Sequence, residues 1–273
     1  MIKLLRLSGH AIVFLALTIL TQLGGLVYLL TIYVAKKYRL ARWKTLALFL
    51  IGYCFSSFLI LPQFSHLLGR EPLPWTGELR PLNVTTCLLN RHYVTPELKD
   101  QMLRVSAQMQ QEFPGSHLQY LDACFPLVDG FPLLPHLSHN DGRKIDLAFY
   151  YADINTNKSL DDAPSPIGYG VHEDPKGDEP NTTESCLEGG HWQYGFVDYL
   201  VPDWSKDKYK VNKFQTRRLI QLLSEDEATD KLFLEPHLKY RWNLAKYTNI
   251  KFHGCHAVRH DDHIHTQVIR PKE

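Results

Sequence analysis

Hydrophobic residues are concentrated in two long uncharged stretches near the start of the chain. Ala11 to Ala35 has no charged residue and would span about 37 Å as a helix, which exceeds the roughly 30 Å hydrocarbon core of a membrane. Thr45 to Leu61 is a second uncharged run of about the minimum spanning length. Gln22 and the pair Gly24-Gly25 interrupt the first stretch, but a membrane helix tolerates such residues. We therefore predict a transmembrane helical hairpin over residues 1–62.

A short basic loop separates the two stretches and sets the predicted topology. Its cations are Lys36, Lys37, Arg39, Arg42 and Lys44. Because loops this basic stay on the cytoplasmic side, we expect a hairpin in the cytoplasmic membrane with the C-terminal domain on the periplasmic or extracellular side. Lys3 and Arg6 argue weakly for the opposite orientation of the first helix. The alternatives are a buried globular hairpin and a cleaved signal peptide, for which the first apolar run is too long.

Beyond residue 62 the pattern changes to short periodic segments. Residues 63–81 are rich in proline and glycine and predict a stiff linker, which leaves residues 82–273 as the soluble domain. Apolar positions at helical spacing predict helices after Thr95-Pro96 and over Asn212–Ser224. Runs of β-branched and aromatic residues predict strands at His117–Cys124, Lys144–Ala152, Lys231–Leu234, Ile250–Cys255 and His263–Ile269. This mixture indicates an α+β domain on an antiparallel sheet, with Asp153–Gly190 as a long irregular insertion or lid.

Charge and cysteine usage narrow the class of protein. The net charge of +1 gives no reason to expect a nucleic-acid partner. Cys54 lies in the second apolar stretch, whereas the other four cysteines, Cys87, Cys124, Cys186 and Cys255, lie in the soluble part. An even number there suits two disulfides in an oxidising compartment, with three possible pairings. Four buried thiols are the alternative.

The chain has 14 histidines, and two clusters of them predict a metal site. His263 and His265 lie two positions apart on a predicted strand, so both side chains point to the same face. His139 ends a turn, and Asp146 begins the apolar strand that follows it. A carboxylate entering such a strand is unfavourable without a partner, and a cation would supply one.

Two imidazoles and one carboxylate with an open fourth position are typical of a catalytic zinc ion. We therefore predict Zn²⁺ as the cofactor, bound by His139, Asp146 and His265. Iron oxygenases use the same residue types, but their acid normally lies close to the first histidine, and here the two are seven positions apart. Calcium would require more carboxylates and fewer imidazoles. A histidine pair on a solvated strand edge is the alternative for the second cluster alone.

These residues carry a resemblance to a known group of enzymes. His-x-x-Gly-x-x-x-Asp followed by His-x-His resembles the metallopeptidases that include lysostaphin, the D-alanyl-D-alanine peptidases and the hedgehog domain. The penicillin-insensitive murein endopeptidases resemble the chain more closely, through two longer motifs. These are His136, His139, Gly142 and Asp146, followed by His260, His263 and His265. The segment Phe233–Lys239 is also similar, whereas the apolar N-terminal stretches, the basic pair Arg143-Lys144 and the 153–190 insertion depart from that family.

The resemblance implies specific roles for the site residues. His139, Asp146 and His265 would bind zinc, His263 would be the general base or a transition-state stabiliser, and His260 and His136 would line the site. A protonated His260 would stabilise an oxyanion. Four further residues have open assignments: Arg143 as a substrate-carboxylate ligand or a solvated charge, Trp192 and Tyr194 as cleft or core residues, and Glu235 as an acceptor for a zinc-bound imidazole.

The leading functional hypothesis is a membrane-anchored zinc metallopeptidase of the cell envelope. It would hydrolyse amide bonds in peptidoglycan peptides, and its partners would be that substrate and the lipid bilayer, which it contacts through two helices. The first alternative is a zinc-containing binding or signalling module of the same fold without catalysis. The second is a membrane-anchored structural protein whose histidines are incidental.

Overall fold

The structure is a computed structural model that describes residues 2–192, 194 and 207–270. The chain divides into two compact units, and both are assembled from segments distant in sequence. The first unit comprises Met1–Leu73, Thr85–Pro96 and Ala123–Gly142, and the second comprises Pro74–Val84, Glu97–Asp122 and Arg143–Glu273. Residues 63–81, the expected linker, are shared between the units and contain strands β1 (Glu71–Pro72) and β2 (Leu79–Pro81). Leu73 and Leu79 are buried, so this segment packs into the folded units.

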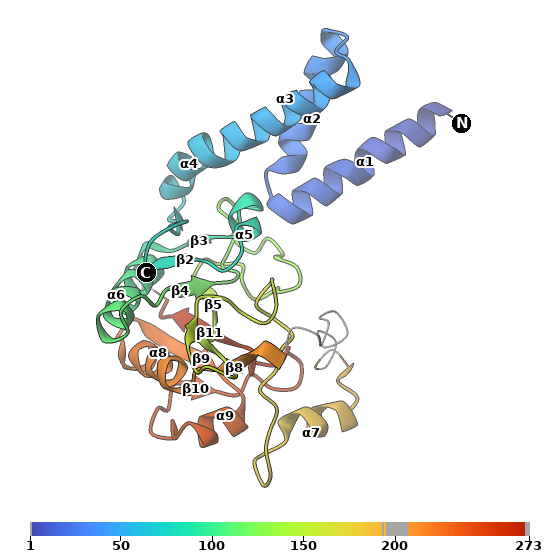
Figure 1. Ribbon diagram of the computed structural model, residues 1–273. Coiled ribbons are helices and arrows are strands. Elements are labelled where there is room, and N and C mark those ends of the chain that lie inside the picture. The colour runs from blue at the N-terminus through green and yellow to red at the C-terminus, as the bar shows by residue number, and fades with distance from the viewer. Residues whose placement is uncertain (1, 193, 195–206, 271–273) are drawn as a thin grey trace. The chain divides into compact units, whose positions relative to one another are not determined.

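The first unit begins with helices α1 (Ile2–Thr21) and α2 (Gly24–Lys37). The chain turns sharply between them, with Gln22 at a φ of 63° (Figure 1). Gly25 allows the two helices to approach closely, because a Cβ atom there would lie 2.0 Å from Thr18 Oγ1. The prediction of one uninterrupted helix from Ala11 to Ala35 is therefore wrong, because the residues treated as tolerated interruptions form a tight interhelical turn.

A second helical stretch follows the basic loop. It consists of α3 (Arg42–Phe55), the π-helical segment η1 (Ser56–Ile60) and α4 (Leu61–Leu67). In the described part of the chain, this continuous stretch from Arg42 to Leu67 is the one helix long and apolar enough to cross a membrane. The apolar part of α1, Leu5–Thr21, is shorter. The helices therefore allow one membrane span by length and composition, where two had been predicted.

Short non-helical segments complete the first unit. Strand β1 pairs antiparallel with β3 (Tyr93–Val94), and a short helix, α5 (Thr85–Leu88), precedes β3. Asn90 lies between α5 and β3 with its side chain fully buried. Its Nδ2 atom lies 3.2 Å from three acceptors, Thr21 O, Tyr53 Oη and Ser57 Oγ. One amide group therefore connects this segment to α1, α3 and η1.

The second unit is built on a six-stranded sheet with the order β10-β9-β11-β5-β4-β2. Its strands other than β2 are β4 (Leu118–Tyr120), β5 (Lys144–Ala148), β9 (Thr229–Phe233), β10 (Ile250–Lys251) and β11 (His263–Val268). The central pairs are antiparallel, whereas β10 runs parallel to β9 and β2 runs parallel to β4. The α+β class is confirmed, and the sheet is mixed at both edges.

Two amphipathic helices pack beside this sheet. α6 (Pro96–Glu112) and α8 (Lys213–Glu225) lie side by side (Figure 1), and Arg218 on α8 donates to Glu112 at 2.6 Å. Asn212 caps α8 by accepting a hydrogen bond from Gln215 N. On the central strands, residues such as Ile145 and Ile264 are fully buried. Both predicted helices are therefore confirmed, and they contribute to the core of this unit.

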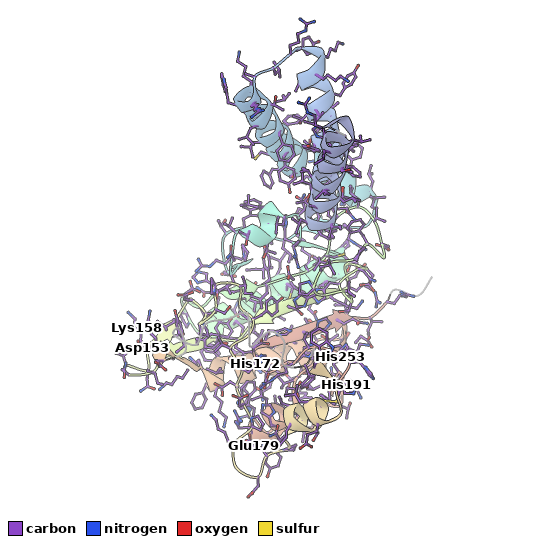
Figure 2. The ribbon with its side chains drawn as sticks, turned by 90° about the vertical axis from the view of Figure 1, so that its right-hand side faces the viewer. Asp153, Lys158, His172, Glu179, His191 and His253 are labelled. Atoms are coloured by element: carbon purple, nitrogen blue, oxygen red, sulfur yellow. A yellow bond between two sulfur atoms is a disulfide. The ribbon has the colours of Figure 1, made fainter. Side chains whose placement is uncertain are left out.

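The 153–190 insertion contains regular structure and is tied to the second unit. Its strand β7 (Ser159–Leu160) joins β6 (Tyr151–Asp153) and β8 (Tyr209–Val211) in a three-stranded antiparallel sheet. Asp153 and Lys158, at the turn between β6 and β7, lie at the outer edge of this unit in Figure 2. Its helix α7 (Thr182–Glu188) carries Cys186, which forms a disulfide with Cys255 before β11. Two disulfides had been predicted with their pairing left open, and one is present among the described residues. Cys87 and Cys124 are buried thiols of the first unit.

Candidate metal centre

Asp146 and His265 face each other on neighbouring antiparallel strands. The register of β5 and β11 places them directly opposite, so their side chains share one face of the sheet. His265 Nδ1 lies 2.8 Å from Asp146 Oδ1. His263 is two residues earlier on the same face, as predicted, and its Nε2 lies 3.8 Å from the same carboxylate oxygen. Two strands thus bring one carboxylate and two imidazoles together.

The carboxylate of Asp146 is fully buried and held at both oxygens. Oδ1 accepts from His265, and Oδ2 accepts a 2.8 Å hydrogen bond from the hydroxyl of Tyr169. Burying a carboxylate is unfavourable unless such partners replace water. Tyr169 comes from the insertion, and the sequence pattern contained no signal for its role.

His136 and His139 lie in the loop that ends at Gly142. His139 is buried, and its Nδ1 lies 2.9 Å from the carbonyl oxygen of Ala123. Because a carbonyl only accepts, Nδ1 carries the proton and Nε2 is left as the ligand atom. The ring of His136 lies 5.5 Å from that of His139, in an edge-to-face arrangement.

The backbone conformation and the surroundings of residue 142 explain why this motif has a glycine there. Gly142 has a φ of 70°, which residues with a side chain rarely adopt. A Cβ atom there would also lie 2.6 Å from the guanidinium of Arg70. Arg70 is itself buried and forms an ion pair with Asp129. The turn after His139 is therefore defined both by backbone conformation and by a packed arginine.

One group of side chains could hold a metal ion. His136, His139 and Asp146 belong to a single short stretch of chain, and each offers a ligand atom within 4.8 Å of the others. Our prediction placed His136 at the edge of the site and assigned the third position to His265. The structure places His136 in the ligand group and His265 in direct hydrogen-bond contact with Asp146. His139 and Asp146 are the two members of this group that the prediction also named as metal ligands.

His263 is oriented by the residue that precedes it. Its Nδ1 forms a hydrogen bond with Asp262 Oδ1, and its Nε2 is the nitrogen nearest Asp146. Burial lowers the pKa of His263, but the carboxylates of Asp262 and Asp146 outweigh that effect and raise it above its usual value. The sequence showed Asp262 within the histidine motif, but the geometry was needed to assign it a contact.

His260 lies beside both strand histidines. Its ring centroid is 4.9 Å from that of His263 and 5.7 Å from that of His265. Burial, reinforced by these two imidazoles, lowers the pKa of His260 well below its usual value. The ring is therefore favoured in its neutral form, which differs from the protonated oxyanion donor considered from the sequence. Its Nδ1 atom has no hydrogen-bond partner among the described residues.

Glu235 supports the backbone that carries His260. This buried carboxylate accepts from the Tyr194 hydroxyl and from Thr182 Oγ1, both at 2.6 Å, and from His260 N at 3.2 Å. Glu235 therefore accepts from the backbone N–H group of His260, whereas the sequence suggested a zinc-bound imidazole as its donor. Tyr194 belongs to this buried network, whereas 69% of Trp192 is exposed.

Arg143, considered either as a substrate-carboxylate ligand or as a solvated charge, has a structural contact. Its Nη1 donates to the carbonyl oxygen of Val268 at the end of β11, at 3.1 Å. The backbone strengthens the same connection, because Val268 N donates to Arg143 O at 3.0 Å. Arg143 thus helps to hold β5 and β11 in register.

The donor set suits zinc better than the harder cations. Imidazole nitrogens and a carboxylate are ordinary zinc ligands, whereas calcium and magnesium prefer oxygen ligands throughout. The hydrogen bonds to Asp146 from Tyr169 and from His265 hold its carboxylate in a fixed orientation, as is usual around protein metal ligands. No protein-family model and no curated protein matches the chain. What the site can bind therefore follows from the chemistry of its side chains.

Proposed function

We propose that the protein is a membrane-anchored zinc peptidase that hydrolyses amide bonds in peptidoglycan peptides. The observation that carries this proposal is the β5–β11 register, which sets Asp146 opposite His265 with His263 beside them. A buried carboxylate surrounded by imidazoles is a ligand set prepared for a divalent cation. The alternative of incidental histidines does not account for their burial on one face of a central strand pair.

The residues have distinct roles in this proposal. His139, Asp146 and His265 hold the zinc ion, with His136 as a further ligand or an adjacent donor. Zinc bound there supplies Lewis acidity for the scissile carbonyl and lowers the pKa of a bound water to about 7. His263 takes up and returns a proton at Nε2, the nitrogen that faces the carboxylate. Neutral His260 packs against the histidine pair.

The proposed substrate and compartment rest on separate observations. The motif spacing shared with the murein endopeptidases supports a peptidoglycan peptide. The apolar helix from Arg42 to Leu67 supports attachment to a membrane. The Cys186–Cys255 disulfide supports an oxidising compartment outside the cytoplasm.

Zinc content tests the metal site first. The full chain, purified in detergent, is expected to retain about one zinc per molecule after dialysis, measured by elemental analysis. Asp146→Asn is expected to lose most of it. Asp162→Asn is the control, because this exposed carboxylate accepts from Tyr209, outside the site. A wild-type protein without zinc, which also fails to bind added zinc, would rule out the proposal.

Digestion of cross-linked muropeptides then tests the activity. We expect cleavage by the zinc-loaded protein, loss of cleavage with a chelator, and recovery when zinc is restored. His263→Ala should abolish turnover and keep most of the zinc, whereas His66→Ala, at an exposed histidine, should change neither. A wild-type protein that holds zinc and leaves every muropeptide intact would instead favour the non-catalytic zinc module.

A further inference from the structure

A short segment of the insertion makes a series of polar contacts with the histidine strand. We call this segment, Tyr169–Glu173, the strap. Tyr169 donates to Asp146, and Gly170 N donates to Asp262 Oδ2 at 2.6 Å. Both partners belong to the proposed active site or adjoin it, so the inference that follows rests on the proposed function.

We propose that Asp262 is a positioning residue that couples the strap to His263. One carboxylate oxygen accepts from Gly170 N, and the other accepts from His263 Nδ1. This arrangement places the proton of the neutral imidazole on Nδ1 and leaves the Nε2 lone pair facing Asp146. The strap thereby fixes both the orientation and the tautomer of the proposed general base.

Only a carboxylate can accept a hydrogen bond from both of these neighbours of Asp262. A backbone N–H group always donates, so the oxygen facing Gly170 must accept. A second accepting oxygen then requires His263 to donate from Nδ1. An asparagine has one accepting oxygen and one donating NH₂ group. If its oxygen faced Gly170, its NH₂ group would face His263 and would favour the tautomer with the proton on Nε2.

The strap is anchored independently of Asp262, so the position of Gly170 N is well defined. His172 Nδ1 lies 2.7 Å from Asp261 Oδ1, and Glu173 N donates to Asp261 O at 2.9 Å. On its outer side, Glu173 O accepts from His237 Nε2 at 2.7 Å, and the Glu173 carboxylate accepts from Arg241. His172 is almost fully buried, and Figure 2 shows it within the body of this unit.

The alternative is that Asp262 only packs the strap against the strand. A packing role predicts that substitution changes stability and leaves the His263 tautomer and the split between kcat and KM unaltered. A positioning role predicts the opposite, because the side chain would act on a proton position. The two roles therefore differ in a property that can be measured directly on His263.

Histidine-selective ¹⁵N NMR of the full chain in detergent measures that property. Long-range proton–nitrogen correlations distinguish the protonated from the unprotonated ring nitrogen, and the His263 signals are assigned as those missing in His263→Ala. We expect Nδ1 to be protonated in the zinc-loaded wild type at neutral pH. In Asp262→Asn we expect this tautomer to be lost or mixed. Asp162→Asn should retain the wild-type pattern.

Kinetics and zinc content complete the comparison. Asp262→Asn should lower kcat on muropeptides about 10- to 100-fold, as loss of a supporting hydrogen bond commonly does, with little change in KM or zinc content. Thiol counts that match the wild type would show that the Cys186–Cys255 bond, and hence the fold around it, is intact. Asp162→Asn should have wild-type kcat.

The outcomes test the positioning role of Asp262 separately from the peptidase proposal. An unprotonated Nδ1 in wild-type His263 overturns the positioning role, even if Asp262→Asn fails to fold. An Asp262→Asn protein with wild-type tautomer and kcat also overturns it. A tautomer that changes in Asp262→Asn upholds the positioning role, and if the zinc-loaded wild type itself cleaves no muropeptide, the peptidase proposal falls while the positioning role stands.

Discussion

Asp146 Oδ1 accepts a hydrogen bond from His265 Nδ1 at 2.8 Å and lies 3.8 Å from His263 Nε2. Both histidines of the strand therefore lie close to a single carboxylate oxygen. The second oxygen is held by Tyr169. One carboxylate thus connects β5, β11 and the strap. The properties of the site should depend on Asp146 more than on either histidine alone.

Asp146→Asn should weaken zinc binding at least tenfold, because the amide has one accepting oxygen and no charge. The measurement is competition with a metal-binding dye on purified protein in detergent. Asp162→Asn should bind zinc as the wild type does. Equal affinity in wild type and Asp146→Asn would show that the metal is held elsewhere.

Gly142→Ala should destabilise the protein by more than the usual penalty for a left-handed residue, which is about 1 kcal/mol. The added Cβ would meet the Arg70 guanidinium at 2.6 Å. Gly177→Ala is the matched control, because Gly177 also has a positive φ of 57° but nothing within 4 Å of a Cβ atom. Thermal unfolding in detergent should therefore give a lower midpoint for Gly142→Ala. Equal midpoints would mean that Arg70 moves aside easily.

Gly25→Ala should separate α1 from α2, because the new methyl group would lie 2.0 Å from Thr18 Oγ1. Gly9→Ala, also in a helix, has open space around its Cβ and should be neutral or mildly stabilising. Spin labels at positions 10 and 28, where His10 and Tyr28 now share a hydrogen bond, report the separation after Cys54 is replaced by serine. We expect a longer or broader distance distribution in Gly25→Ala alone.

His92 should make the protein sensitive to mild acid. Burial lowers the pKa of His92 from its usual 6.5 to about 3. The unfolded chain therefore binds a proton that the folded chain excludes, so this contribution to stability is complete above pH 6.5 and is lost as the pH falls towards 3. Between pH 7 and pH 4 the wild type should lose up to about 3 kcal/mol more than His92→Phe, which keeps a ring beside Tyr93.

Unfolding free energies of the two proteins at several pH values test this prediction. Parallel curves of unfolding free energy against pH for wild type and His92→Phe would show that protonation of His92 in the folded protein does not destabilise it.

Local patterns predicted the regular elements of the second unit well. Pro96 begins α6 and Asn212 caps α8, because both signals act within one helical turn. The turn at Gln22 could not be predicted in the same way. Its side-chain oxygen accepts from Leu127 N, 105 residues away, and such a contact leaves no trace in hydropathy.

The candidate site shows the same difference between features set by local sequence and features set by distant contacts. The alternation of His263 and His265 and the entry of Asp146 into a strand were visible from spacing. The exact partner of Asp146 across the sheet required the β5–β11 register, and Tyr169 required the path of the insertion. His260 shows a further limit, because its neutral state follows from the burial and neighbouring rings that only the folded chain provides.

The Cys186–Cys255 bond has a consequence for biosynthesis. At about 5–20 residues per second, Cys255 follows Cys186 from the ribosome after roughly 3 to 14 s, given their separation of 69 residues. During that interval, in an oxidising compartment, the thiols already available to Cys186 are those of Cys87 and Cys124. A bond formed between Cys186 and either of these thiols in that interval would have to be resolved by thiol–disulfide exchange before the final bond could form.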